Sequence, residues 1–238
     1  MAPRLLIGNV AGGHALATGL ERAGHSVVAV DADADPGAIQ HVDLVVMGGD
    51  EAWVEGNADK LAPYARPRQM FLHSALGRGA QLLDAVEVNH AIVMCAHNLF
   101  ADVWVTSAAD EVGETVVGLL VAEMGGINVP VADADRPALQ AAQHLRALEA
   151  TVRQDAWELV SSVLTRVLTD AEAVRAEFFD APAGPPPPAG PAQLNRTADA
   201  IADPAVRRLF VDLARRSAER AGDTAGELWA YSKYEGTI

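Results

Sequence analysis

The chain has 238 residues, enough to bury a core without metals or disulfides, and it carries 18 basic against 32 acidic residues. The formal net charge of −14 repels polyanions and excludes binding to nucleic acid or to an anionic membrane surface. The single cysteine, Cys95, can form neither an intramolecular disulfide nor a multi-thiolate metal site. No apolar stretch reaches the roughly 18 residues of a spanning helix, and the first residues show no cleavage-site pattern. We therefore expect a cytoplasmic protein that does not enter membranes.

Short β-branched runs alternate with helix-like stretches from residue 4 to about residue 131. This alternation is typical of β-α-β units on a mostly parallel sheet. The expected strands are Arg4–Ile7, Ser26–Val30, Leu44–Met47, Gln69–Leu72, His90–Cys95, Val103–Thr106 and Ile127–Val131. Helices are expected over Gly13–Ala23 and Glu114–Glu123, each followed by a glycine stop. Residues 1–134 are therefore predicted to form one α/β domain.

After Arg136-Pro137 the pattern changes to one long helical repeat. Apolar side chains recur at steps of three and four residues at Leu145, Leu148, Val152, Ala156, Leu159, Val163 and Val167. The segment 181–191 contains four consecutive prolines and is expected to be an extended spacer. Beyond it, Asp203-Pro204 is typical of a helix N-cap followed by proline at the first helical position. Residues 135–238 are therefore predicted to form an all-helical domain. This domain is too small to bury the long helix on all sides, which predicts a homodimer through it.

The turn after the first expected strand is rich in glycine and opens the first helix. It reads Gly8-Asn9-Val10-Ala11-Gly12-Gly13. Backbone N–H groups and the helix dipole at such a turn can hold a pyrophosphate, as in the Rossmann G-x-G-x-x-G turn, although Val10 replaces the second glycine. Asp31 follows the second strand. In Rossmann domains a carboxylate at this position accepts hydrogen bonds from the ribose hydroxyls and repels a 2′-phosphate, so NAD is favoured over NADP. Alternatively, the glycines only permit tight packing and Asp31 caps a loop.

Two acidic runs resemble metal loops only superficially. Asp31, Asp33 and Asp35 have the opening spacing of a calcium loop, but proline and valine replace its glycine and its bidentate glutamate. Asp133 and Asp135 are typical of a solvated turn before the long helix. No metal site is predicted.

His97 is the best candidate for a general base. It follows an apolar strand, at the carboxyl edge where parallel sheets place their ligands. His73 and Ser74 end the preceding strand at the same edge and could face the same cavity; a packed loop is the alternative for each. The sequence contains no G-x-S-x-G elbow, no P-loop and no Cys/His pair with suitable spacing, so nucleophilic hydrolysis and phosphoryl transfer lack support.

Three short segments resemble the prephenate/arogenate dehydrogenase family. Ala96-His97-Asn98-Leu99-Phe100 resembles its His-Pro-Met-Phe-Gly stretch, Gln143-His144-Leu145-Arg146 its Gln-Ala-Leu-Arg segment, and Ala202-Asp203-Pro204 its Ala-Gln-Asp-Pro. A second resemblance, over Val103–Val163 with Gly125-Gly126 and Arg136-Pro137, is to Rossmann proteins related to 6-phosphogluconate dehydrogenases. Both resemblances imply a Rossmann-like domain, a helical second domain and a nicotinamide cofactor.

The first resemblance implies an NAD-dependent oxidoreductase of aromatic amino acid biosynthesis. It would decarboxylate prephenate, arogenate or an amino-deoxyprephenate analogue oxidatively. His97 would take the proton from the ring hydroxyl or amine, Ser74 would hydrogen-bond the same group, and Gln143, Arg146 and Arg196 would bind the small carboxylic acid. The sequence departs from the family at Asn98, where the proline is missing. Two alternatives remain: a non-catalytic dimer that binds a small acid or a partner protein, and a 6-phosphogluconate-related dehydrogenase with another substrate.

Overall fold

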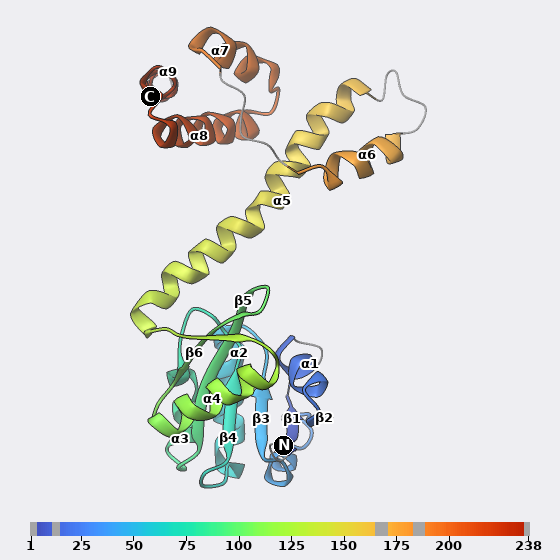
Figure 1. Cartoon of the computed structure of the whole chain (residues 1–238), viewed down its shortest axis with the longest axis vertical. Coiled ribbons are helices and arrows are strands. Elements are labelled where there is room, and N and C mark those ends of the chain that lie inside the picture. Colours follow the sequence, from blue (N-terminus) through green and yellow to red (C-terminus); the bar gives the residue numbers. More distant parts are fainter. Residues whose placement is uncertain (1–3, 11–14, 165–170, 183–188, 236–238) are drawn as a thin grey trace. The chain divides into compact units, whose positions relative to one another are not determined.

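The computed structural model describes residues 4–10, 15–164, 171–182 and 189–235 (Figure 1). The chain divides into two compact units, Met1–Arg146 and Ala147–Ile238. The division falls within the long helix α5 (Arg136–Leu164), so the first turns of this helix belong to the first unit. Among the described helices, none is both long and apolar enough to cross a bilayer.

The first unit is built on a seven-stranded sheet. Its strands are β1 (Leu6–Asn9), β2 (Ser26–Ala29), β3 (Leu44–Met47), β4 (Met70–His73), β5 (Ile92–Phe100), β6 (Val103–Ala108) and β7 (Ile127–Pro130). The strand order is β2-β1-β3-β4-β5-β6-β7, and every neighbouring pair is parallel except β5 with β6. The predicted mostly parallel α/β sheet is therefore confirmed.

Helices cover both faces of this sheet. The regular helices of the unit are α1 (Ala15–Arg22), α2 (Glu51–Leu61), α3 (Asp84–Glu87) and α4 (Glu111–Glu123), and the short 3-10 turns are η1 (Pro36–His41), η2 (Ala62–Tyr64), η3 (Ala80–Leu83) and η4 (Asp133–Asp135). Side chains of α1 and α4 pack with Leu44 and Val46 in one core, and side chains of α2, η3 and α3 pack with Val45 and Met47 in the other. Successive residues of β3 point to opposite faces, so its continuous apolar run fills both cores.

The carboxyl ends of β1 and β3 form the switch point of the sheet. β1 pairs with β2 on one side and with β3 on the other. The helix after β1, α1, packs on one face, and the helix after β3, α2, packs on the opposite face. Because the connections after β1 and β3 lead to opposite faces of the sheet, a crevice forms at the ends of these strands. Open α/β sheets bind their ligands in such a crevice.

β5 is longer than its expected range and continues through His97. It forms an antiparallel hairpin with β6, in which His97 pairs with Val105 and the register shifts between Asn98 and Phe100. The Asn98 side-chain amide donates to the carbonyl of Ala101 at 2.8 Å, and Ala101 has a positive φ of 45°. His97 therefore lies within the strand and not past its end, because pairing with β6 extends β5 beyond its apolar run.

Within the described residues, the second unit contains the rest of α5 and four further helices. These are α6 (Ala171–Asp180), α7 (Pro191–Ala200), α8 (Pro204–Ala221) and α9 (Thr224–Glu235). Asp203 caps α8 as predicted, since its side chain accepts from the backbone N–H groups of Ala205 and Val206 at 2.7 and 3.2 Å. Trp157 of α5 packs against Phe178 and Phe179, with ring centroids 5.5 and 6.3 Å away.

The expected proline spacer 181–191 ends earlier than predicted. Pro191 is already the first residue of α7, a position where its missing N–H and its fixed φ are tolerated. The four consecutive prolines, 185–188, lie outside the described residues.

Candidate functional site

Buried polar side chains form hydrogen bonds with the backbone of the loop after β4, residues 74–79. The N–H of Ala75 donates to His73 Nδ1 at 3.2 Å, which places the ring proton on His73 Nε2, and that atom donates to the carbonyl of Gly79 at 2.9 Å. Burial lowers the pKa of His73 to about 4. The Cys95 thiol contacts the Ala75 carbonyl at 3.3 Å, and burial raises its pKa to about 11. His73 therefore stabilises the loop as a neutral, buried ring. It does not face a cavity, contrary to the expectation from the sequence.

Arg136, the first residue of α5, is completely buried. Its Nη1 donates to the carbonyl of Leu76 and to the sulfur of Cys95, both at 3.3 Å, and its Nη2 donates to Ser107 Oγ at 2.9 Å. Its Nε lies 3.3 Å from Asp133 Oδ1 without the geometry of a hydrogen bond. One guanidinium thus ties together the loop 74–79, β5, β6 and the segment that leads into α5.

Sequence reasoning missed this role of Arg136 and interpreted the acidic run before it as a solvated turn. Asp133 forms an ion pair with the buried guanidinium and is only partly exposed. The available signal was the charged residue placed directly before Pro137 at the start of an amphipathic helix. Its buried partners come from segments 29 to 60 residues away, so the contact itself could not be derived from the sequence.

Both ring nitrogens of His97 are hydrogen-bonded, in the pattern of a neutral imidazole. Its Nδ1 lies 2.6 Å from the backbone carbonyl oxygen of Ser74, and its Nε2 lies 2.9 Å from the side-chain nitrogen of Gln143. A carbonyl can only accept, so the ring proton is on Nδ1, and Nε2 accepts from the Gln143 amide. Burial lowers the pKa of His97; the Ser74 bond opposes this shift and the charge of Arg136 adds to it. At neutral pH the ring therefore presents a basic nitrogen, as a general base requires.

A pocket of about 420 Å³ opens beside this nitrogen, within the size range of small-molecule sites. Its walls come from the start of α2, the loop after β4, His97 on β5 and the first turns of α5. Ser74 lines the same pocket, so the structure brings His97 and Ser74 together as the sequence predicted. The observed contact, however, is made by the Ser74 carbonyl, which orients the imidazole.

The residues expected to bind a substrate carboxylate lie at different places. Gln143 lines the His97 pocket and contacts the ring. Arg146 is exposed, with its guanidinium 6.0 Å from the ring centroid of Phe100, and it is not among the residues of the pocket wall. Arg196 is an exposed residue of α7 in the second unit. The predicted substrate roles of Arg146 and Arg196 thus stay predictions.

The first half of the glycine turn is compatible with a dinucleotide. A Cβ on Gly8 would lie 3.0 Å from a methyl group of Val30 and 3.1 Å from one of Val42, so this glycine allows close packing of β1. The side chain of Val10 packs against the core on the α2 face of the sheet. Its isopropyl group is therefore directed at least partly into the protein. Asn9 ends β1 and is buried, and Gly12 and Gly13 lie outside the described residues.

Asp31 caps its own loop, as the alternative interpretation predicted. Its Oδ1 accepts from the backbone N–H groups of Asp33 and Ala34, both at 3.0 Å. The side chain is exposed at the end of β2, and these two bonds use one of its carboxylate oxygens. Capping and binding of a ribose hydroxyl are thus not mutually exclusive.

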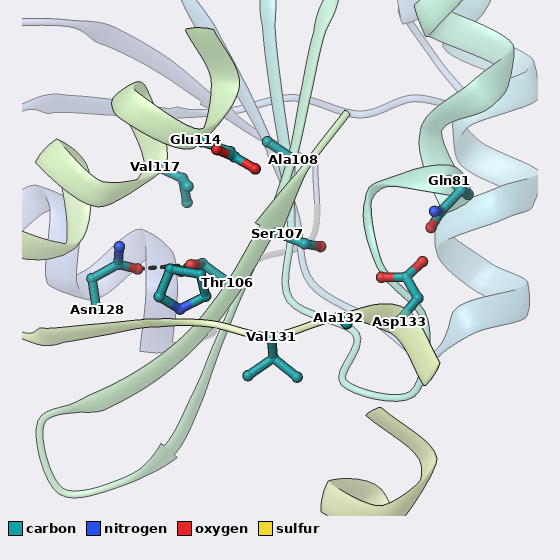
Figure 2. A pocket seen from close by; sticks show the side chains of 11 residues that line it. Gln81, Thr106, Ser107, Ala108, Glu114, Val117, Asn128, Val131, Ala132 and Asp133 are labelled. Atoms are coloured by element: carbon teal, nitrogen blue, oxygen red, sulfur yellow. Dashed lines mark hydrogen bonds between the residues drawn. The ribbon is translucent and has the colours of Figure 1, made fainter. Parts of the chain in front are cut away.

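A second pocket, of about 380 Å³, lies over β6, β7 and α4 (Figure 2). Figure 2 shows Glu114 on one side of it, Gln81 and Asp133 on the other, and the hydrogen bond from Thr106 to Asn128 Oδ1 at 2.7 Å. Ser107 and Asp133 in its wall are partners of Arg136. The lining residues that the structure describes here include no histidine, cysteine or lysine. The His97 pocket is therefore the better candidate for an active site.

Comparisons with known proteins agree with this architecture. Residues 132–233 match the family described as 6-phosphogluconate dehydrogenase C-terminal domain-like. No curated protein is significantly similar in sequence to this chain. A candidate NADP oxidoreductase of Bacteroides fragilis has a similar structure, with a TM-score of 0.65 and 13% identity over 91% of this chain and 98% of that one.

Two further solved structures share the fold. A candidate prephenate dehydrogenase of Corynebacterium glutamicum has a TM-score of 0.51 at 18% identity, over 99% of this chain and 87% of that one. A pyrroline carboxylate reductase of Plasmodium falciparum, solved with NADP bound, has a TM-score of 0.50 at 12% identity, over 96% of each chain. The expected resemblance is thus confirmed at the level of the fold: a Rossmann-like domain is followed by a helical region that matches the 6-phosphogluconate dehydrogenase C-terminal domain-like family.

Proposed function

We propose that this chain is a nicotinamide-dependent dehydrogenase in which His97 is the general base. The observation that carries the proposal is the hydrogen-bonding state of His97: Nδ1 donates to the Ser74 carbonyl, and Nε2 accepts from the Gln143 amide, with both residues in the wall of one pocket. The pocket lies at the carboxyl edge of a sheet whose switch point, at β1 and β3, is the usual place of a dinucleotide. The similarity to structures described as an NADP oxidoreductase and as a reductase with NADP bound supports the nicotinamide-dependent class.

The residues at the switch point fit a dinucleotide. The partly buried side chain of Val10 packs against the core, which supports room for a diphosphate beside the end of β1. The carboxylate oxygen of Asp31 that does not cap the loop is suited to a ribose hydroxyl, and its charge disfavours the 2′-phosphate of NADP. We therefore propose NAD in preference to NADP. The cofactor would supply the hydride acceptor for the oxidation.

In this mechanism the substrate hydroxyl or amine takes the place of the Gln143 amide at His97 Nε2. Proton transfer to Nε2 produces an imidazolium, and the Ser74 carbonyl stabilises it through the Nδ1 proton. Gln143 is then free to hydrogen-bond the substrate from its position on α5. Prephenate, arogenate and an amino-deoxyprephenate analogue are the substrates that the family resemblance supports.

Mutation of His97 tests this proposal. His97→Asn should lower kcat by about 10²- to 10⁴-fold and leave the dissociation constant of NAD⁺ nearly unchanged, because the base acts on the substrate alone. The assay follows nicotinamide reduction at 340 nm with the three candidate acids. His41→Asn, on the exposed turn η1, is the matched control and should retain full activity. Unchanged turnover in His97→Asn would remove this residue from the mechanism.

We also propose that the chain forms a homodimer through its helical unit. The support is a set of large apolar side chains that the unit leaves exposed: Leu148, Leu159, Val163, Leu213, Leu228 and Tyr231. Exposed apolar surface of this extent is typical of a contact between subunits. Light scattering after gel filtration should give twice the 25.0 kDa chain mass, and a mass of one chain at micromolar concentration would contradict the proposal.

A further inference from the structure

The His97 pocket is lined by acidic and not by basic side chains. Among the described residues of the wall, Asp50 and Glu51 carry the formal charges, and none is a lysine or an arginine. Asp50 is committed to capping α2, since its Oδ1 accepts from the backbone N–H of Trp53 at 2.8 Å. Glu51 is half-buried and forms no hydrogen bond or ion pair with any residue that the structure describes. The nearby cation Arg78 pairs instead with Glu55, at 3.4 Å.

Glu51 and Gln140 converge over the backbone of Gly77. A Cβ on Gly77 would collide with Glu51 Oε1 and would lie 2.6 Å from Gln140 Oε1. The two side chains come from α2 and α5, which are far apart in the sequence, and the glycine lets both carbonyl-type oxygens approach the backbone. Two acceptor oxygens therefore face the same space with no described donor between them. Rotation of the Gln140 amide would supply a neutral donor but would leave the charge of Glu51 without a counter-ion.

This arrangement favours a positively charged ligand group over a negatively charged one. A half-buried carboxylate attracts an ammonium group more strongly than a solvated one does, and an ammonium can donate to both oxygens at once. A carboxylate at the same place would be repelled by Glu51 and would find no lysine or arginine among the wall residues that the structure describes. The pocket thus suits a positively charged group close to the reacting atom.

We infer that the substrate of the His97 site carries an ammonium group, which Glu51 and Gln140 bind beside the general base. The inference rests on the proposed function for the role of His97. It divides the candidate substrates by charge: those with an amine fit this wall, and those whose only charged groups are carboxylates do not. Glu51 is then a specificity-determining residue at the start of α2.

A pair of small molecules with matched size tests the inference without cofactor or turnover. The full chain is titrated at low salt and pH 7 with 3-amino-1-propanol and, separately, with 3-hydroxypropanoate. The signals of the His97 Nδ1–H and of the Trp53 indole are followed by ¹H–¹⁵N NMR. We expect saturable shifts with the amino alcohol and affinity at least about tenfold lower for the hydroxy acid. Equal affinities, preference for the acid, or no binding of either probe would overturn the inference.

Two variants make the test specific. Glu51→Gln keeps the size of the side chain and should remove most of the preference, whereas Glu55→Gln, on the same helix but outside the pocket, should retain it. Loss of the preference in both variants would reduce the effect to general surface charge and contradict the inference. Binding of NAD⁺, measured separately, reports on the proposed function: a chain that binds the amine but not the cofactor refutes the dehydrogenase and leaves the ammonium site intact.

Discussion

Replacement of Arg136 by methionine tests whether one buried guanidinium holds the candidate site together. Methionine approximately fills the volume of the aliphatic part but removes the donors to the Leu76 carbonyl and to Ser107 Oγ. It also leaves the Asp133 carboxylate without its partner. The loop 74–79, which orients His97 through the Ser74 carbonyl, then loses its hydrogen bond from Arg136.

The expected loss of stability follows from these contacts. Each buried group left without a partner costs about 1–3 kcal/mol, and removal of one member of a buried ion pair costs about 3–5 kcal/mol. Asp133 is 38% exposed and can regain water, so its contribution is the smallest. We expect the first unit to lose about 3–5 kcal/mol in Arg136→Met. Arg136→Lys keeps the charge but not the planar guanidinium. Its free energy of unfolding should lie between that of Arg136→Met and that of the wild type.

Native-state hydrogen exchange of β5 measures this loss in the first unit alone. The slowest amides of Ile92–Phe100 report the opening free energy of the sheet, independently of the helical unit. Arg78→Met is the matched control: its guanidinium is 46% exposed and pairs with Glu55 at the surface, so the change should stay within about 1 kcal/mol. If Arg136→Met also stays within 1 kcal/mol of the wild type, the assigned role of Arg136 is wrong.

Three further predictions concern the titrating groups of the site. Because burial lowers the pKa of His97, kcat/KM should fall on the acid side with an apparent pKa below 6.5; an apparent pKa above this value would contradict the assigned environment. His73 has a folded pKa of about 4 against 6.5 in the unfolded chain, so its stabilising contribution is complete above pH 6.5 and is lost as the pH falls towards 4. The loss should amount to about 3 kcal/mol by urea denaturation and should be absent in His73→Gln. Burial raises the pKa of Cys95 to about 11, so iodoacetamide at pH 8 should alkylate the native thiol at least about 100-fold more slowly than the urea-unfolded chain; equal rates would show that it is accessible.

Much of the α/β unit is predictable from the sequence because its strands are buried on both faces. Leu44–Met47 is a continuous apolar run and forms β3 with the expected bounds. The helix α2 was missed, since Glu51–Leu61 carries a glycine and several polar residues and has only a weak apolar periodicity. Its start nevertheless supplies Glu51, so the missed helix is also the source of an unexpected site residue.

The grouping of His97, Ser74 and Gln143 was predictable in part. The rule that ligands bind at the carboxyl edge of parallel strands brought His97 and Ser74 to one place, and the family resemblance added Gln143. The sequence could not show that a backbone carbonyl orients the imidazole, because this contact depends on the path of the loop 74–79. The buried Arg136, which hydrogen-bonds to that loop, has partners from three distant segments. The local sequence pattern around Arg136 does not reveal these contacts.

Calorimetric titration of the full chain with NAD⁺ is the most direct test of the central claim that this fold still serves redox chemistry. The proposed function predicts saturable binding with a dissociation constant in the micromolar range, weaker binding of NADP⁺, and an unchanged constant for NAD⁺ in His97→Asn. Absence of heat up to millimolar concentrations of both dinucleotides would contradict the claim and favour a binding protein that kept the fold without the reaction.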